Sequence, residues 1–224
     1  MTFSDYAYQY ALEAYYNEFV TEDLGRFFDS DTVVYNPKAI KNKKTNVYVL
    51  GISGGGHMSF VQKVFASKLK AKYTDIDFLY GYLCGTLSSK LVSIYNDKAV
   101  VGYIKKKKLK PLIDHEMIVM VLFDFLLSLE HSPNKWIVYG RVLTPMLMNA
   151  DKLCDRSAII IYGDSVRRAH SNIQIGKTVS IGGGSDSLID QFENDYKDIS
   201  ELEIVLKSSG YERAVINTDT GEIM

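Results

Sequence analysis

The sequence is poor in the residues that cross-link a chain or anchor it in a membrane. Two cysteines, Cys84 and Cys154, lie far apart and form no CxxC pair, which excludes a disulfide-rich scaffold and a cysteine zinc site. The most apolar run, Met117 to Leu129, is shorter than the ~20 residues of a membrane-spanning helix and contains Asp124. We therefore expect no membrane partner, no metal and two reduced thiols.

Neither sign of charge dominates the chain. The 26 Lys and Arg residues nearly balance the 27 Asp and Glu residues, and the net charge is −1. Such a balance exerts no overall attraction on nucleic acid, so a nucleic-acid partner is unlikely by composition. Residues 1–20 lack the basic start of a signal peptide and carry Asp5, Glu13 and Glu18. These features predict a cytoplasmic protein.

The sequence is rich in hydrophobic residues, enough to build a substantial core, and in aromatic side chains. Of the 224 residues 46% are hydrophobic, which is enough for one large single-core domain. Sixteen tyrosines and ten phenylalanines exceed what packing alone usually needs. Tyrosine suits half-buried interface positions, so this excess favours contact with a partner chain.

The first 31 residues differ in charge from the rest of the chain. They hold seven acids and one base, Arg26, so residues 32–224 carry about +5. Apolar and aromatic residues recur at helical spacing between Ala7 and Phe19. We expect residues 1–31 to form an acidic, aromatic helical arm beside a single globular domain, 32–224. The arm is expected to contact the basic body or a neighbouring subunit, or else to be an ordinary first helix.

Hydrophobic patterning after residue 31 predicts alternating strands and helices. Strands are expected in 31–37 up to Pro37, and in the covered apolar run 46–52. A helix is favoured over 59–73 by residue preference, with strand left open, and 112–133 predicts a helix of about five turns, apolar nearly all round. Other elements follow by pattern and turn residues. The expected strands are 99–104, 136–147, 157–164 and 211–223; strand, glycine bend and helix are expected in 76–95 and 177–196, and a last helix in 198–210 with Asp198 as N-cap and Gly210 at C′.

This order of elements suits two architectures. The first is an α+β fold of four layers, αββα, with two stacked sheets between helices. The alternative is a three-layer α/β/α arrangement around one sheet.

Glycines mark three turns where an anion could be held. The first, at 51–57, offers Ser53, Gly54, Gly55, Gly56 and His57 as a possible oxyanion or anion loop, and His57 is the histidine most worth mutating. The turns at 81–89 and 180–187 match neither the GK[ST] ending of a P-loop nor GxGxxG. Plain structural bends explain all three equally well.

The turns at 51–59 and 81–85 together are similar in spacing to patatin-like lipases. There a glycine-rich oxyanion loop precedes a GxSxG nucleophile elbow. Here the nucleophile position is Leu83, and Cys84 is one step out of register. A leucine on the elbow removes that chemistry, so this resemblance is disfavoured.

From about Thr32 onward the chain resembles the proteasome β-subunit family of N-terminal-nucleophile hydrolases. The matching segments, in order, are TVVYNPKAI, VYVLGISGGG, KYTDIDFLYGYLCGTLSSKL, VSIGGGSDSLIDQF and AVINTDTGEI. The resemblance implies the αββα fold. It also implies Thr32 as nucleophile, Lys72 as tuning cation, Gly85 as oxyanion donor, and Ser185 with Asp186 as supporting pair.

Two departures from that family's pattern bear on activity. The Gly-Asp-Ser step reads Gly51-Ile52-Ser53, so an apolar side chain replaces a carboxylate. Thr32 follows 31 residues, so its amine is not a free base unless the Asp31–Thr32 bond is cleaved. We therefore expect a proteasome-like subunit that is catalytically inactive and acts in assembly or interaction, through residues 1–31 or as a homo-oligomer. The alternative is an active hydrolase, either a threonine peptidase after cleavage or a serine or cysteine hydrolase using the glycine turns; neither function needs a cofactor.

One further cluster is visible in sequence. Asp164 stands close to Arg167, Arg168 and His170. We interpret it as a solvated turn, with a subunit-interface ion-pair cluster as the alternative.

Overall fold

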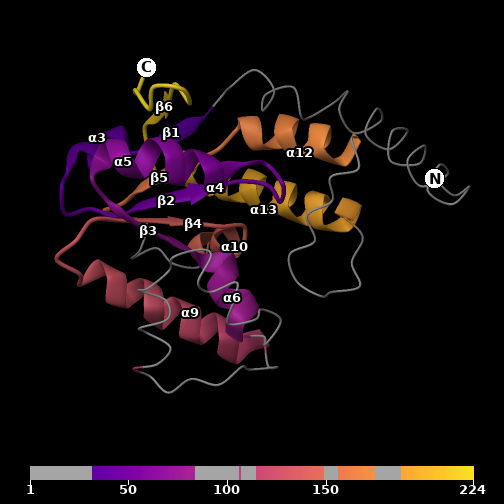
Figure 1. Cartoon of the computed structure of the whole chain (residues 1–224), viewed down its shortest axis with the longest axis horizontal. Helices are drawn as coiled ribbons and strands as arrows, with labels where there is room; N and C mark the ends of the chain where they lie inside the picture. Colours follow the sequence, from indigo (N-terminus) through magenta and orange to yellow (C-terminus); the bar gives the residue numbers. More distant parts are fainter. Residues whose placement is uncertain (1–31, 84–105, 107–114, 149–155, 175–187) are drawn as a thin grey trace, which may run out of the picture.

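The computed structural model of the chain describes residues 32–83, 106, 115–148, 156–174 and 188–224 (Figure 1). These residues form one six-stranded sheet with helices on both faces. Its strands lie in the order β3-β4-β2-β5-β1-β6. They are β1 (Val33–Tyr35), β2 (Val47–Leu50), β3 (Lys72–Asp75), β4 (Trp136–Tyr139), β5 (Ala158–Ile161) and β6 (Arg213–Val215).

The sheet is mixed, and four of its strands run in parallel. β2 pairs in parallel with β4 on one side and with β5 on the other, and β3 extends the parallel set beyond β4. β1 runs antiparallel to both β5 and β6. The carboxyl ends of β2, β3, β4 and β5 therefore meet at one edge of the sheet. We call this edge the carboxyl edge.

Alternate residues of each strand enter two separate hydrophobic clusters, one on each face of the sheet. In β2, Tyr48 and Leu50 belong to the first cluster, whereas Val47 and Val49 belong to the second. The same alternation occurs in β4 and β5. Because both faces are buried, the parallel strands are apolar along their whole length rather than alternating with polar residues.

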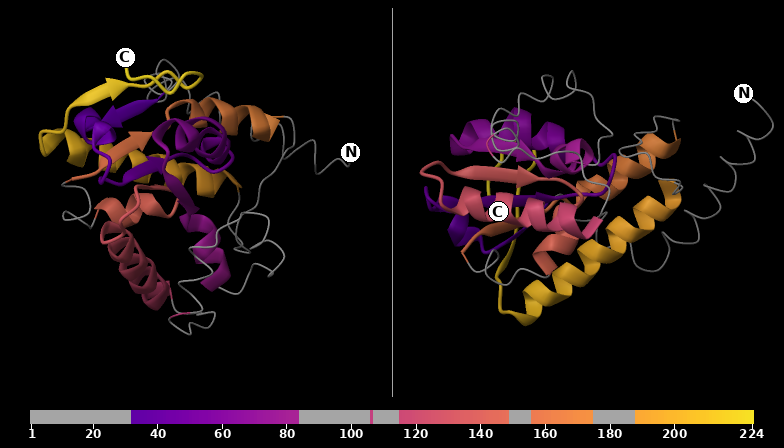
Figure 2. Two further views of the ribbon diagram at one scale, coloured as in Figure 1. Left: turned by 60° about the vertical axis from the view of Figure 1, so that its left-hand side comes forward. Right: turned by 90° about the horizontal axis from the view of Figure 1, so that it is seen from below.

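Helices form the layer over each face (Figure 2). The first face is covered by α6 (Ile76–Leu83), α9 (His115–Glu130), α10 (Leu143–Met148), α12 (Asp164–Gln174) and α13 (Leu188–Ser208). The second face is covered by α3 (Pro37–Lys41) and by α4 (His57–Phe60), η1 (Val61–Phe65) and α5 (Ala66–Leu69). The last three segments follow one another without a break, and η1 is a π-helical turn.

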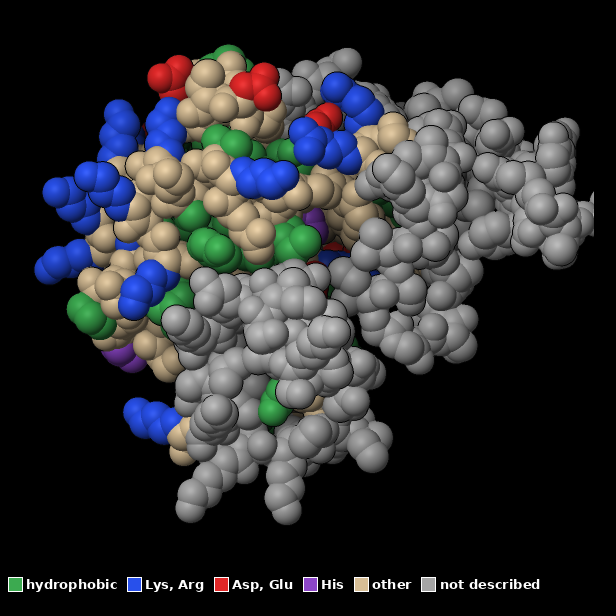
Figure 3. All heavy atoms as spheres, viewed as in Figure 1, with side chains coloured by type: hydrophobic (Ala, Val, Ile, Leu, Met, Phe, Trp, Pro, Cys, Tyr) green, Lys and Arg blue, Asp and Glu red, His purple; other side chains and the backbone are tan. Residues whose placement is uncertain are grey.

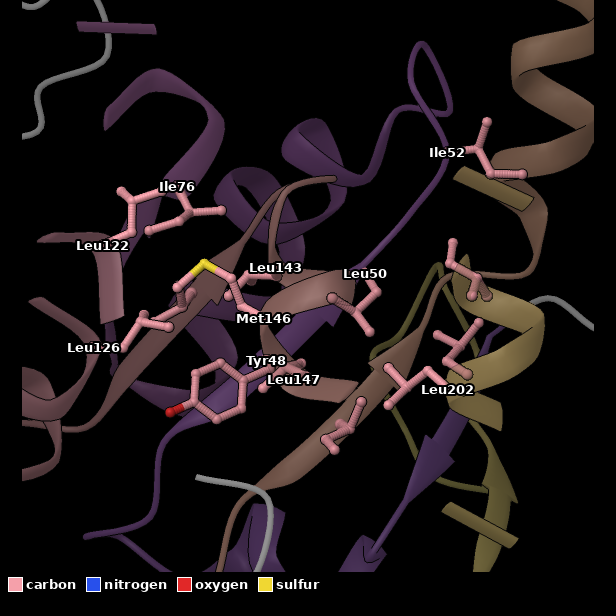
Figure 4. Close-up of a cluster of buried hydrophobic side chains, with 14 of the residues drawn as sticks. Tyr48, Leu50, Ile52, Ile76, Leu122, Leu126, Leu143, Met146, Leu147 and Leu202 are labelled. Atoms are coloured by element: carbon pink, nitrogen blue, oxygen red, sulfur yellow. The ribbon is translucent and has the colours of Figure 1, made fainter. Parts of the chain in front are cut away.

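The first cluster is the larger core (Figure 4). Leu143, Met146 and Leu147 of α10 lie beside Tyr48 and Leu50 of β2, while Leu122 and Leu126 of α9 approach from another side. The Tyr48 hydroxyl keeps a partner there, since it donates a 2.6 Å hydrogen bond to Glu130 Oε1. The aromatic ring is thus fully buried without leaving its polar atom unsatisfied.

The structure confirms several expected elements. β2 is buried at every position, β5 lies inside 157–164, and α9 matches the predicted apolar helix. The favoured helix over 59–73 is confirmed for most of its length by α4, η1 and α5, but it ends at Leu69, and residues 72–73 belong to β3. Gly210 follows α13 with φ of +78°, as a residue at C′ requires.

Other expectations were wrong in their boundaries or type. Residues 76–83 form α6 instead of a strand, because the Asp75 side chain accepts the N–H groups of Asp77 and Phe78 and so starts a helix. Pro37 begins α3 rather than ending a strand. Asp198 is inside α13, not at its N-cap, since α13 runs unbroken from Leu188 to Ser208.

The second sheet of the expected αββα fold is not found among the described residues. These residues make one sheet flanked by helices, and the strand expected in 99–104 lies outside them. The acidic arm 1–31 also lies outside them. No helix in the described ranges is long and apolar enough to cross a membrane.

Candidate functional site

The glycine-rich turn leaves β2 at the carboxyl edge and leads directly into α4. We call residues Gly51–Gly56 the glycine loop. Its glycines stand five positions apart in the pattern Gly-x4-Gly, which is the glycine spacing of the phosphate-binding P-loop, also a connection from strand to helix. The two residues that follow are His57 and Met58, where a P-loop has Lys and Ser or Thr.

Glycine is required in this loop for two physical reasons. Gly56 has φ of +80°, a left-handed conformation that other residues rarely adopt. Gly55 lies so close to α12 that an added Cβ would stand 2.3 Å from Ser165 Cβ. The loop is thus tightly turned and pressed against the start of α12. Ile52 N–H donates to Ser165 Oγ at 3.2 Å and ties the two segments together.

An arginine of α12 lies over the end of the glycine loop. A Cβ added at Gly56 would be 3.2 Å from both Cδ and a terminal nitrogen of Arg168. The Arg168 Nε donates to Asp164 Oδ2 at 2.6 Å, and its guanidinium stacks 5.6 Å from the Tyr162 ring. Arg167 also pairs with Asp164, at 3.5 Å. The cluster seen in the sequence at 164–168 is therefore part of the loop's surroundings, not a separate turn.

His57 is the first residue of α4, and its side chain is buried against Gly51 of the glycine loop. Its ring lies edge-on to Tyr139 at 6.1 Å, and its Nδ1 would be 2.7 Å from a Cβ added at Gly51. That Nδ1 has no hydrogen-bond partner among the described residues. Burial lowers the pKa of His57, opposed by the negative charge of Asp77, so the imidazole is neutral at neutral pH. His57 consequently supplies no cation at the position where a P-loop has its lysine.

A carboxylate of α13 reaches the other side of the loop. Asp195 Oδ2 accepts the main-chain N–H of Ser53 at 2.9 Å, and Asp195 Oδ1 lies 3.7 Å from Arg141 Nε. The Asp195 side chain is only 6% exposed. Burial raises the pKa of Asp195 to about 7, even though Arg141 and the Ser53 N–H act to lower it. A buried carboxyl group that ionises near neutral pH next to a glycine turn is a feature of functional sites.

Arg141 is itself held in place by the strand ends. Asp77, just after β3, accepts the N–H groups of Arg141 and Val142, both at 2.8 Å. These bonds fix the turn that follows β4 against the start of α6. The guanidinium of Arg141 then approaches Asp195, which in turn accepts the Ser53 N–H of the glycine loop.

Of the residues implied by the proteasome resemblance, the structure describes Thr32 and Lys72, and it does not bring these two together. Thr32 precedes β1 at the carboxyl edge and is completely buried, and its hydroxyl has no partner within the described ranges. Lys72 is exposed and begins β3, the outermost strand next to β4, where it pairs with Trp136. It therefore lies at the amino ends of the parallel strands, opposite to the carboxyl edge. Gly85, Ser185 and Asp186 lie outside the described residues.

Lys72 belongs instead to a lysine-rich surface away from the glycine loop. Lysine and arginine side chains gather on the side of the molecule that carries α3 (Figure 3). The exposed lysines near the amino ends of β2 and β3 are Lys41, Lys43, Lys44, Lys70 and Lys72. We call this set the lysine edge.

Sequence reasoning proposed the loop residues Ser53–His57 but missed their partners. Asp195, Arg141 and Arg168 come from three different elements, and the Ser53–Asp195 contact joins residues 142 positions apart. No local pattern announces such a contact. The Gly-x4-Gly spacing after a buried strand was the available signal for a phosphate loop.

The described residues hold no group of three or more His, Cys, Asp or Glu side chains that could bind a metal ion. In the glycine loop the N–H groups of Ile52, Ser53 and Gly55 already donate to acceptors. The carboxyl edge can nevertheless offer an anion the main-chain N–H groups at the start of α4 and the guanidinium groups of Arg141 and Arg168. Comparison of the sequence with models of known protein families and with curated proteins found no match to either.

Proposed function

We propose that the chain binds a phosphorylated ligand at the glycine loop, with the phosphate groups held by main-chain N–H groups and by Arg168. The observation that carries this proposal is the connection itself. A glycine loop with Gly-x4-Gly spacing joins the carboxyl end of a parallel strand to a helix, and an arginine side chain lies over its last glycine. Ligands of open α/β sheets bind outside the carboxyl ends of the strands, where this loop lies.

The charge of the ligand follows from the groups around the loop. The first N–H groups of a helix have no acceptor inside the helix, and they favour an anion. Arg168 is half-exposed and always charged, so it can turn from Asp164 toward a phosphate group. Because His57 is neutral, it adds no positive charge to the phosphate site, and the charge must come from Arg168.

The two departures from a P-loop favour binding over phosphoryl transfer. In a P-loop the lysine reaches the terminal phosphates and the Ser or Thr hydroxyl holds Mg²⁺. His57 and Met58 supply neither group here. We therefore propose a phosphate-binding protein whose affinity does not depend on Mg²⁺.

The test is calorimetric titration of the full chain with sodium tripolyphosphate and with ATP, with and without Mg²⁺. Arg168→Gln is expected to weaken binding about tenfold or more, because a hydrogen bond to a charged group contributes about 1.5–3 kcal/mol. Arg167→Gln is the matched control, since Arg167 is equally exposed and also pairs with Asp164, yet only Arg168 lies over Gly56. No binding at millimolar ligand, or equal losses in the two variants, would contradict the proposal.

Our second proposal is that the chain acts in protein assembly, and it is supported by opposite charges on residues 1–31 and on the lysine edge. Residues 1–31 have seven acids and one base, and the lysine edge gives them a complementary surface, in this chain or in a neighbouring copy. Sedimentation velocity of the full chain at low and high salt tests it. A strict monomer at tens of micromolar in both would count against assembly. The hydrolase alternative predicts a mass loss of residues 1–31, or labelling of Thr32, Ser53 or Cys84 by electrophilic probes.

A further inference from the structure

Asp195 already makes the two kinds of contact that a bound phosphate would make. One carboxylate oxygen accepts the N–H of Ser53 within the glycine loop, at 2.9 Å. The other lies 3.7 Å from the guanidinium of Arg141. A main-chain N–H and an arginine are the usual partners of a phosphate oxygen. The Asp195 carboxylate therefore occupies a position that would also suit an anionic ligand.

We propose that Asp195 is an internal competitor for the anion site, so that the glycine loop is partly blocked until the carboxylate is neutralised or displaced. The inference rests on the proposed phosphate-binding function and adds its regulation. An ionised Asp195 repels a phosphate and occupies the Ser53 N–H and Arg141. A protonated Asp195 carries no charge and releases its hold on Arg141.

The groups that face Asp195 come from four elements. They are the Ser53 N–H of the glycine loop, Arg141 before α10, Asp77 of α6, and Asp198 one turn along α13. Burial, with smaller contributions from Asp77 and Asp198, raises the pKa of Asp195 to about 7 against the opposing effects of Arg141 and the Ser53 N–H. The block is therefore strongest above pH 7 and is relieved as the pH falls below it.

The size of the block follows from the population of the neutral form. If only the protonated form binds, apparent affinity is reduced by its fraction, which is about one-tenth at one pH unit above the pKa. Asp195→Asn removes the charge and keeps the shape. We expect Asp195→Asn to bind tripolyphosphate about tenfold more tightly than the wild type at about pH 8, and about equally at about pH 6.

The experiment measures dissociation constants of wild type and Asp195→Asn for tripolyphosphate at both pH values. The ratio of the two constants is the readout, because the titration of the ligand and of His57 is common to both proteins. Glu201→Gln is the control, because it removes one negative charge from an exposed position on the same helix, where Glu201 pairs with Lys197. The dissociation constants of Glu201→Gln and of the wild type should be nearly equal at both pH values. Sulfate binding to the wild type, with a ligand of constant charge, should tighten as the pH falls and needs no variant.

The outcomes separate this inference from the proposed function. If the wild type binds through Arg168 but Asp195→Asn binds no more tightly at about pH 8, Asp195 is not a competitor and the phosphate site stands. An equal gain in Glu201→Gln would also overturn the inference, since the effect would then be one of net charge. If neither protein binds tripolyphosphate or sulfate at either pH, both proposals fail.

Discussion

Replacing Gly55 by alanine tests how the glycine loop is packed. An ideal Cβ at this position would stand 2.3 Å from Ser165 Cβ, 2.6 Å from Ser165 Cα and 2.8 Å from the Ile52 carbonyl oxygen. Carbon atoms pack well at about 3.5–4.0 Å, so the overlap exceeds 1 Å by rough estimate. Two of the three atoms belong to the main chain, so no side-chain rotation relieves it. The loop and α12 must move apart.

The cost can be worked out from the contacts that this movement breaks. Overpacking of a tight site costs about 1–3 kcal/mol. Separation also stretches the bond from Ile52 N–H to Ser165 Oγ, which contributes about 1 kcal/mol. We expect Gly55→Ala to lower the free energy of unfolding by about 2–4 kcal/mol.

Gly54→Ala is the matched comparison, one residue away. Gly54 has φ of +76° but no atom within 4 Å of an added Cβ, so its substitution costs only the conformational strain of about 1–2 kcal/mol. Urea denaturation followed by circular dichroism gives both values, and an unchanged m-value shows that unfolding remains two-state. A Gly54→Ala cost equal to or above that of Gly55→Ala would refute the close packing of loop and α12.

Two further predictions concern buried titratable groups. Lys135→Met should lower the free energy of unfolding, measured by urea denaturation, by about 2–3 kcal/mol. The buried Lys135 Nζ donates to the carbonyls of Ile40 and Asn42 at 2.6 and 3.1 Å, and the substitution removes both charged hydrogen bonds. The exposed Lys72→Met should cost far less. His57 has a folded-state pKa below its ordinary value of 6.5, so the unfolded chain binds the extra proton and the wild type should lose stability relative to His57→Phe as the pH falls below 6.5. Parallel stability curves for these two proteins between about pH 7 and pH 5 would contradict the buried neutral state of His57.

Strongly apolar local patterns predicted their elements correctly. β2 and β5 are buried at every position, α9 is a long apolar helix with one exposed side, and each is an element of the expected type. The two strands were predictable because both of their faces are buried, so every position is apolar. Gly210 is a second success, since its left-handed conformation suits the end of a helix.

The errors arose where one side chain decides between two structures. Residues 76–83 are as apolar as a strand, but the Asp75 carboxylate caps the N–H groups of Asp77 and Phe78 and starts α6. Asp198 looked like an N-cap, but buried residues at helical spacing continue through it from Phe192 to Leu206. In both cases contacts with the core outweighed a local preference.

The sequence by itself determined that this chain builds a large core and that an apolar strand within 46–52 leads into a glycine turn, which could hold an anion or simply bend the chain. These properties depend on residues adjacent in the chain, so a local pattern reveals them. Tertiary structure alone decided that the strands form one mixed sheet with β2 between β4 and β5. It also decided that Arg141, Ser165, Arg168 and Asp195 surround the loop. Hydrophobic periodicity records which face of an element is buried, but not which element covers it, and a contact such as Ser53–Asp195 exists only after the sheet and α13 have packed together.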